Sequence, residues 1–139
     1  MNKIKKNDLK LGFQSESIVK GLLEKHFNIT LISTKSYCVV DYTNEEFEIE
    51  LKTRNNKYAS YPTTMIGQNK INHMKKSLTK GKRCILSFKF TDGLYILELN
   101  EDNIKLLGEN QYGGRDDRNK DEYKINGYCF IPITLLTKI

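Results

Sequence analysis

The amino-acid sequence predicts a mixed α/β fold, in which a central mixed β-sheet is flanked by helices in the order α-β-β-β-α-β-β. Two helical patterns, at about residues 7–26 and 63–79, enclose three strand patterns, and further strand patterns follow the second helix. The composition is that of a soluble globular chain, because 38% of the residues are hydrophobic and 29% are charged. The length fits a single domain spanning residues 1–139, without repeats or linkers.

The first helix is expected from about Asn7 to His26, with Asn7 or Asp8 as its N-cap. Its apolar stripe consists of Leu11, Ile18 and Leu22, and is widened by Val19 and Leu23. On a helical wheel of about 100° per residue, Glu16 lies roughly 20° from Leu23. Glu16 is therefore expected at the edge of the buried face.

Three strands are expected next, over residues 28–33, 37–42 and 47–53. The third alternates cleanly: one face carries Phe47, Ile49 and Leu51, and the other carries Glu48, Glu50 and Lys52. Residues 43–46 have the composition of a turn. The second and third strands should therefore form a hairpin that brings Asp41 near Glu50.

The remaining elements follow from similar patterns. A polar loop over 54–64 leads into a helix from about Thr63 to Thr79 that ends before Gly81. Strands over 83–90 and 94–99 are joined by a turn at 91–93. The polar segment 108–122 is expected to be a long loop, and an apolar strand over 127–132 precedes a short tail.

Charge is distributed unevenly along the chain, which has a net charge of +6. No Asp or Glu occurs from Ala59 to Thr91, whereas residues 41–50 are rich in acids and contain no basic residue. A basic surface beside an acidic cluster suits a protein that binds a polyanion and holds a cation at the point of chemistry. An ordinary solvated helix face is the alternative explanation for the lysines.

Cysteine usage and hydropathy indicate a cytoplasmic location. Cys38, Cys84 and Cys129 lie far apart among apolar neighbours and form no CxxC pair, so buried reduced thiols are expected. No apolar run approaches the roughly 18 residues of a membrane span, and no apolar signal core follows the basic N-terminus. We therefore expect no membrane partner. The richness in Lys, Asn and Ile hints at an AT-rich genome, such as that of a phage or other mobile element.

The predicted hairpin carries residues suited to hydrolysis of a phosphodiester. Asp41 and Glu50 can supply carboxylates to Mg²⁺ or Mn²⁺, and the carbonyl of Leu51 can add a backbone oxygen. Lys52 lies about 6.6 Å farther along the strand, on the same face as Glu50. Its ammonium can orient or help deprotonate the attacking water, or stabilise developing negative charge. The alternative is a solvated hairpin face with Glu–Lys pairs.

Asp41 and Glu50-Leu51-Lys52 resemble the signature of the PD-(D/E)xK nuclease superfamily, many members of which also place a Glu on the first helix, as Glu16 is here. The residue before Asp41 is Val40, whereas the superfamily signature has Pro at this position. The resemblance covers roughly residues 11–90 and implies a restriction-endonuclease-like core. It implies a Mg²⁺-dependent DNA endonuclease, structure-specific or of low sequence specificity, with Glu16, Asp41, Glu50 and Lys52 as catalytic residues.

Residues outside the hairpin are candidates for binding the substrate. Contacts with nucleic acid are expected from Lys70, Lys75, Lys76, Arg115 and Arg118, and from Gln68, which lies where some superfamily members have a Gln. Acidic neighbours of the two arginines equally favour a plain surface loop. Tyr58 and Tyr61 either stack on bases or anchor their loop. The two histidines, His26 and His73, fit no metal or triad spacing and are expected at the surface or as caps.

Several alternatives stay open from the sequence. Glu48 shares the face of Glu50, and Glu50 is favoured as the metal ligand because it alone has a Lys two residues later. Small junction-resolving members of the superfamily have a similar bare core and act as homodimers, so the resemblance implies a homodimer. The competing functions are a non-catalytic nucleic-acid-binding module with the same fold and a protein-interaction domain with an acidic partner. DNA and RNA are not distinguished.

Overall fold

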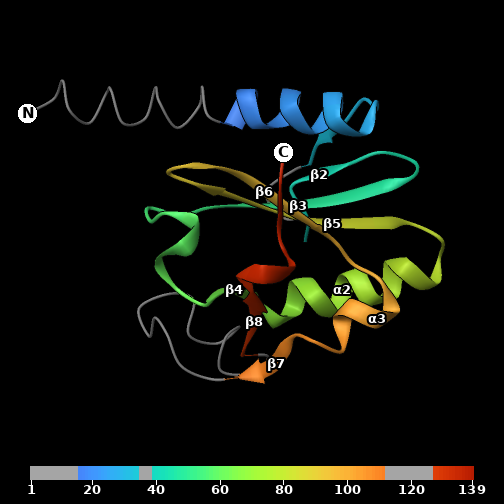
Figure 1. The fold of residues 1–139 in the computed structure, drawn as a ribbon. Coiled ribbons are helices and arrows are strands. Elements are labelled where there is room, and N and C mark those ends of the chain that lie inside the picture. The colour runs from blue at the N-terminus through green and yellow to red at the C-terminus, as the bar shows by residue number, and fades with distance from the viewer. Residues whose placement is uncertain (1–15, 35–38, 112–126) are drawn as a thin grey trace, which may run out of the picture.

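The computed structural model describes residues 16–34, 39–111 and 127–139, and arranges them in layers around a large mixed sheet (Figure 1). In spatial order, the strands of this sheet are β1 (Ile32–Ser33), β2 (Tyr42–Thr43), β3 (Phe47–Thr53), β5 (Arg83–Phe90), β6 (Gly93–Glu98) and β9 (Thr137–Lys138). A smaller sheet has the order β4 (Thr63–Gly67), β8 (Tyr128–Pro132) and β7 (Gly108–Gln111). The mixed sheet flanked by helices confirms the predicted fold class.

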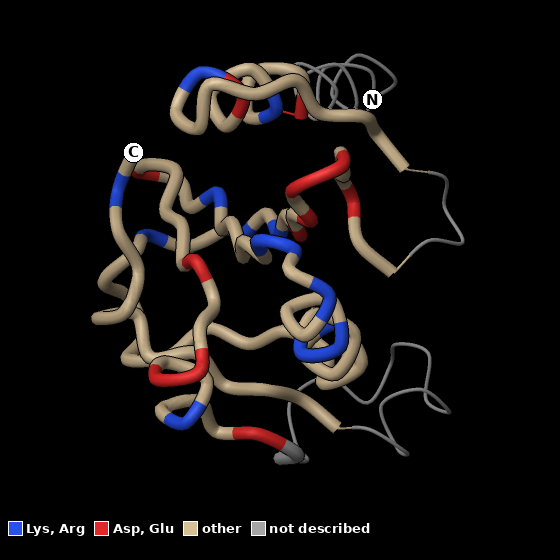
Figure 2. Tube along the Cα trace, turned by 90° about the vertical axis from the view of Figure 1, so that its right-hand side faces the viewer, with Lys and Arg blue, Asp and Glu red and all other residues tan. Residues whose placement is uncertain are grey.

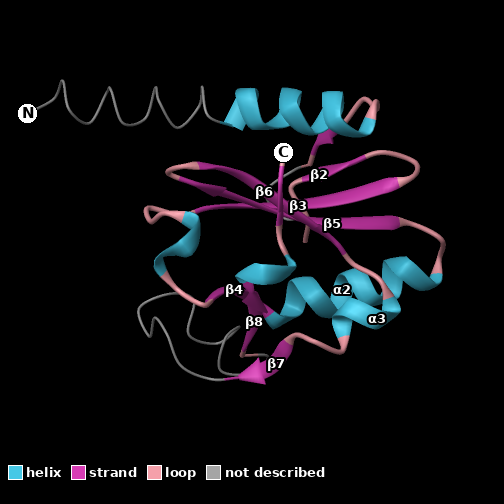
Figure 3. Ribbon diagram, viewed as in Figure 1, coloured by secondary structure: helices cyan, strands magenta, loops and turns pink. Residues whose placement is uncertain are grey.

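Helices cover both faces of the large sheet (Figure 3). The first helix, described over residues 16–27, lies on one face. On the other face lie α2 (Gln68–Thr79) and α3 (Glu101–Ile104), together with the smaller sheet. Short 3₁₀ turns, η1 (Tyr58–Ser60) and η2 (Ile133–Leu135), complete the described elements. Within the described part of the chain, none of these helices is long and apolar enough to cross a membrane.

The first helix docks through one side of its predicted apolar stripe, which confirms Val19 and Leu23 as buried residues. Val19 and Leu23 are buried against Phe47 and Ile49 of β3. Ile18 and Leu22, expected in the buried stripe, are instead 61% and 43% exposed, so this part of the prediction was wrong. Apolar residues occupy two adjoining faces of the helix, about 100° apart, and periodicity alone does not say which one docks. The predicted N-cap and Leu11 lie outside the described residues.

The hairpin of β2 and β3 has the predicted antiparallel pairing, with Tyr42 opposite Ile49. The Asn44 side chain makes the turn by accepting hydrogen bonds from the backbone N–H groups of Glu46 and Phe47, at 2.8 and 2.6 Å. Among the described residues of the two preceding strands, only Ile32–Ser33 and Tyr42–Thr43 pair, so the described parts of both are shorter than predicted. In the first, backbone N–H groups at 29 and 31 are bonded to Glu24 of the first helix instead.

Strand β3 runs parallel to β5, with Glu50 opposite Leu86 in the register. The chain between them first forms β4 and then α2, so the predicted helix over 63–79 was wrong for its first five residues. Residues 63–67 pair with β8 (Ile66 opposite Cys129), because their β-branched side chains suit a pleated surface. The helix ends before Gly81 as predicted, and Gly81 has the left-handed φ of +83° that favours glycine at this position.

Long-range pairing accounts for the other differences. Gly108–Gln111, predicted as loop, pairs with β8, and the predicted tail adds β9 to the edge of β6. The short helix α3 was not predicted, although Asn100 and Asn103 form a reciprocal capping box at its start. Strands β3, β5 and β8 agree with prediction within one residue, and β6 begins one residue earlier.

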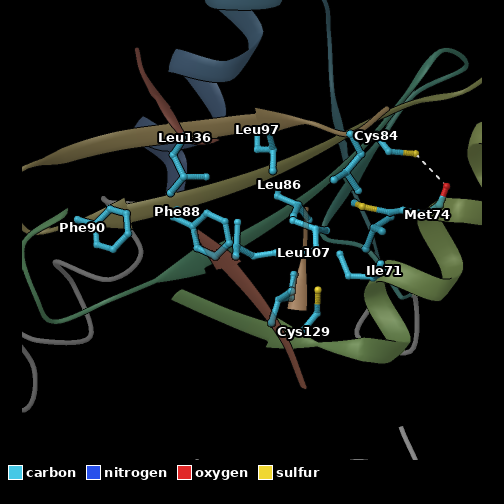
Figure 4. Close-up of a cluster of buried hydrophobic side chains, with 14 residues drawn as sticks. Ile71, Met74, Cys84, Leu86, Phe88, Phe90, Leu97, Leu107, Cys129 and Leu136 are labelled. Atoms are coloured by element: carbon cyan, nitrogen blue, oxygen red, sulfur yellow. Dashed lines mark hydrogen bonds between the residues drawn. The ribbon is translucent and has the colours of Figure 1, made fainter. Parts of the chain in front are cut away.

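The main core lies between the large sheet and the layer of α2 and the smaller sheet (Figure 4). Ile71 and Met74 of α2 pack here with Leu86 and Phe88 of β5. Cys84 and Cys129 are fully buried free cysteines, as predicted, and burial raises the pKa of both thiols to about 12. Cys38 lies outside the described residues. Helix α2 packs on β5 and also contacts the polar face of the neighbouring strand β3, through Lys70 and His73.

Candidate active site

Asp41 and Glu50 meet at the open end of the hairpin. The Asp41 backbone N–H donates to the Ile49 carbonyl at 3.1 Å, and its Oδ2 accepts from the Leu51 N–H at 2.8 Å. These bonds fix an exposed Asp41 carboxylate against the end of β3, within hydrogen-bonding contact of the Glu50 carboxyl. The prediction that the hairpin brings Asp41 and Glu50 together is confirmed.

Glu50 is a buried acid with an unusual pKa. Only 2% of the residue is exposed, and its pKa is raised from 4.5 to about 8. Burial is the largest cause, followed by the hydrogen bond and the charge of Asp41, while the ammonium groups of Lys70 and Lys52 act in the opposite direction. Burial and the neighbouring Asp41 carboxylate therefore both disfavour the ionised form of Glu50.

The surroundings of one carboxylate oxygen of Glu50, Oε2, show whether a metal ion fits this site. Within the described residues, Oε2 is buried and has no hydrogen-bond partner; Lys70 Nζ is 3.6 Å away. An unsatisfied buried carboxylate oxygen is costly and is normally compensated by a cation or donor. Together with Asp41 and the Leu51 carbonyl, it offers the hard oxygen ligands that Mg²⁺ prefers. No cluster of three or more His, Cys, Asp or Glu residues stands ready for a metal in the described ranges, so this donor set has two carboxylates.

Glu48 lies apart from this pair. Its Oε2 is 3.0 Å from His73 Nε2 on α2, whereas Glu50 is the glutamate that contacts Asp41. Because Glu48 Oε2 is also buried without a hydrogen-bond partner among the described residues, it is the contact with Asp41 that favours Glu50 as the ligand. The Glu48–His73 contact was not predicted, because sequence spacing does not show which turn of α2 faces which residue of β3.

Two lysines flank Glu50 from different elements. Lys52 shares its face of β3, as the alternation predicted, and is close enough for its charge to affect the pKa of Glu50. Lys70 reaches from α2, donates to the Val39 carbonyl at 2.5 Å and forms the ion pair with Glu50. Its ammonium thus ties α2 to Glu50, and the expected contact of Lys70 with phosphate stays a prediction.

Asp41 lines a groove that is made of two adjoining hollows, which share Glu16, Leu51 and Thr53. The first, of about 360 Å³, is lined by Glu16 and Lys20 of the first helix, Asp41 and Leu51. The second, of about 620 Å³, continues from Glu16 and Leu51 past Lys52. Glu16 therefore faces the same space as Asp41, and the negative charges of both, after burial, raise the pKa of Tyr42 to about 12. The groove joins the first helix to the end of β3.

The predicted nucleic-acid contacts have varied surroundings. Gln68 is buried, with its amide donating to Asn72 and Glu109 at 3.1 and 3.3 Å, and Lys75 pairs with Glu109 at 2.6 Å. Lys76 is exposed on α2, and Figure 2 shows this basic helix on the same side of the molecule as the acidic β2–β3 turn. Arg115 and Arg118 lie outside the described residues. Sequence reasoning missed Lys20, Arg54 and Asn56 as groove residues.

Comparison with known proteins identifies a family to which this chain is similar. A family model described as "phage putative PDDEXK endonuclease" matches residues 11–139. No curated protein and no solved structure gives a match to the chain. The matched residues include Glu16, Asp41, Glu50 and Lys52, and extend past residue 90, where the similarity noted in the sequence ended.

Proposed function

The chain belongs to the phage putative PDDEXK endonuclease family, and we propose that it is a Mg²⁺- or Mn²⁺-dependent endonuclease that hydrolyses phosphodiester bonds in DNA. The observation that carries this proposal is the contact of Asp41 with a buried Glu50 whose Oε2 lacks a hydrogen-bond partner among the described residues. Asp41 lines the first hollow of the groove and Lys52 lines the second, and Glu50 lies buried beside both. We propose a structure-specific or loosely specific enzyme.

The carboxylates of Asp41 and Glu50 and the carbonyl of Leu51 would hold the cation, and Glu16, on the facing wall of the first hollow, would hold its waters. When bound, such a cation neutralises phosphate charge, lowers the pKa of water and stabilises the leaving oxygen.

The protein's own cations supply the remaining charge. Lys52 lines the groove beside Glu50, where its ammonium orients the attacking water or stabilises charge that develops on the phosphate. Lys20 lines one end of the groove and Arg54 the other, so backbone phosphates on either side of the cut can each meet a cation. Lys76 on α2 would extend this contact, and Lys70 positions Glu50.

Replacing Lys52 tests the proposed chemistry. The wild-type protein is expected to cut supercoiled, linear or branched DNA with Mg²⁺ or Mn²⁺, and to be inactive in EDTA. Lys52→Met should lower the single-turnover rate by roughly 10²- to 10⁴-fold, since it removes a proton-transfer or charge-stabilising group. DNA affinity, measured in EDTA by fluorescence anisotropy, should change only a few-fold.

Lys105→Met is the matched control, because Lys105 is an exposed lysine that follows α3 and lines none of the hollows of the groove. It should cut at the wild-type rate. Undiminished cleavage by Lys52→Met would contradict the assigned role. DNA binding without cleavage in any metal would indicate the non-catalytic binding module, and absence of binding at moderate salt would indicate a protein-interaction domain. An RNA of the same sequence separates the two nucleic acids.

We also propose a homodimer, supported by apolar side chains at the surface. Ile18 and Leu22 lie one turn apart on the outer face of the first helix, and Ile32 is 63% exposed on β1, the edge strand of the large sheet. Exposed apolar groups and an open strand edge are both common at protein interfaces. A second copy of the chain would bring a second active site for paired cuts.

Placing a charge on this surface should separate the two copies. Leu22→Glu is expected to weaken dimerisation by about 30-fold, which is the effect of losing one hot-spot residue worth about 2 kcal/mol. Sedimentation equilibrium measures this as a mass falling toward the 16.2 kDa of one chain. Leu106→Glu, at a residue that is also exposed (60%) but lies after α3, is the control. A wild-type protein that sediments as a monomer would contradict the dimer.

A further inference from the structure

A third hollow, of about 260 Å³, adjoins the catalytic groove. It shares Lys52, Arg54, Asn56 and Tyr61 with the second hollow, and its far wall consists of β4 together with Tyr128 and Phe130 of β8. Among the described residues, none that lines it is an Asp or Glu. It is therefore a small cationic and aromatic compartment that opens beside the proposed catalytic lysine.

Tyr61 lines this hollow and lies on a loop that several contacts hold in place. Three residues earlier, the Tyr58 ring stacks on Tyr95 with 4.1 Å between ring centroids, and its hydroxyl donates to the Ile133 carbonyl at 2.8 Å. The Tyr58 backbone N–H donates to Asp92 at 2.9 Å. Of the two tyrosines that the sequence left undecided, Tyr58 thus anchors the loop. Tyr61 is 62% exposed on this anchored loop, so its ring is available to a ligand.

The polar walls are also fixed in advance. Arg54 Nε donates to Thr64 Oγ1 at 3.2 Å, and its terminal nitrogen donates to the Met65 carbonyl, which holds the planar guanidinium along β4. The Asn56 side chain donates to the Lys57 carbonyl at 2.9 Å, and the Asn56 backbone carbonyl accepts from the Thr91 N–H at 3.1 Å. Polar groups that are already ordered lose less entropy when a ligand binds.

The combination of side chains indicates what this compartment binds. Lys52 and Arg54 alone would suit a phosphate. A phosphate makes no favourable contact with aromatic rings, however, and three of them line this hollow: Tyr61, Tyr128 and Phe130. Nucleobases stack on aromatic rings and guanidinium planes, and amide side chains pair with base edges. The volume is below the usual range of about 300–1,000 Å³ for pockets that hold drug-sized ligands. It suits one planar ring system, and a base stacked in a duplex cannot enter it.

We propose that this hollow, the base pocket, binds an unpaired nucleobase of the substrate close to the scissile phosphate, with Tyr61 stacking on it. This inference rests on the proposed nuclease function and names its substrate class. The preferred DNA has single-stranded or unstacked nucleotides beside the cut, as in a flap, a frayed end or a branch. Lys52, shared by both compartments, sets the pocket next to the reacting phosphate.

A fluorescent base tests the pocket in EDTA, where no cleavage is expected. A blunt duplex and the same duplex with a single-stranded arm are compared, with 2-aminopurine at successive arm positions. We expect tighter binding of the armed DNA and quenching at one or two positions next to the junction. Tyr61→Ala should abolish the quenching and reduce the preference for armed over blunt DNA by roughly 5- to 150-fold, the effect of one lost base-stacking contact.

Two further variants serve as controls for the aromatic ring of Tyr61 and for its position in the pocket. Tyr61→Phe keeps the ring and should keep both the quenching and the preference, whereas Leu106→Ala removes an equally exposed side chain that does not line the pocket and should match wild type. Equal affinity for both DNAs, or full quenching in Tyr61→Ala, would overturn the base pocket. Metal-dependent cutting of blunt and armed DNA at equal rates would overturn it and leave the nuclease function intact. Failure to bind either DNA would overturn both.

Discussion

Glu50→Gln protein is expected to cut DNA at least roughly 10³-fold more slowly than wild type under single-turnover conditions with saturating Mg²⁺. A bound cation contributes several kcal/mol of transition-state stabilisation, and each 1.4 kcal/mol is tenfold in rate. Gln is nearly isosteric with Glu and can donate to Asp41, so the hairpin should keep its shape. The loss would therefore report the missing negative charge rather than a rearranged site.

Glu48→Gln is the matched control for this variant. Glu48 lies two residues earlier on the same face of β3, but it contacts His73 and not Asp41. We expect its cleavage rate to remain within about tenfold of wild type, because the pair of carboxylates is untouched. If Glu48→Gln were the inactive variant and Glu50→Gln the active one, the metal ligand would be Glu48 and the proposed site would be wrong. Isothermal titration with Mn²⁺ gives the same comparison without DNA.

The parts of the fold that depend on neighbouring residues were predictable. The alternation of Phe47 to Thr53 is a local pattern, and it is sufficient to assign Glu50 and Lys52 to the polar face of β3. Strands β4, β7 and β9 depend instead on partners up to about 70 residues away, such as β8 for β4. Their own sequences do not name those partners, and the β-branched residues of β4 were outweighed by the helical pattern that follows them, so the three segments were predicted as helix, loop and tail.

The candidate site divides in the same way. Asp41 and Glu50 lie in one hairpin, so counting residues along two strands was enough to bring them together. The contacts of Lys70 and His73 depend on how α2 packs against β3, and a helical wheel does not determine that packing. The groove is harder still, because it joins the first helix, the end of β3 and the loop after it. Only the complete fold shows that Lys20 and Arg54 lie along one path.

Stability should depend on pH through Glu50, and this is the second large effect. Its pKa is about 8 in the folded protein, against an ordinary value of 4.5. Between these two pH values the folded protein binds more protons than the unfolded chain, so its free energy of unfolding must fall as the pH rises. The slope due to this one group is about 1.4 kcal/mol per pH unit, which amounts to several kcal/mol over the window.

Glu50→Gln should remove this dependence, because the amide does not titrate. Urea unfolding in EDTA at pH 5, 6, 7, 8 and 9 measures the free energy of unfolding of both proteins, and their difference cancels the other titrating groups. We expect the variant to be about as stable as wild type near pH 5 and more stable by several kcal/mol at pH 9. A difference that stays constant from pH 5 to 9 would show that Glu50 is ionised throughout. Ionising the buried Glu50 carboxyl would then cost no free energy of folding. The reason for expecting a metal ion at its Oε2 would be gone.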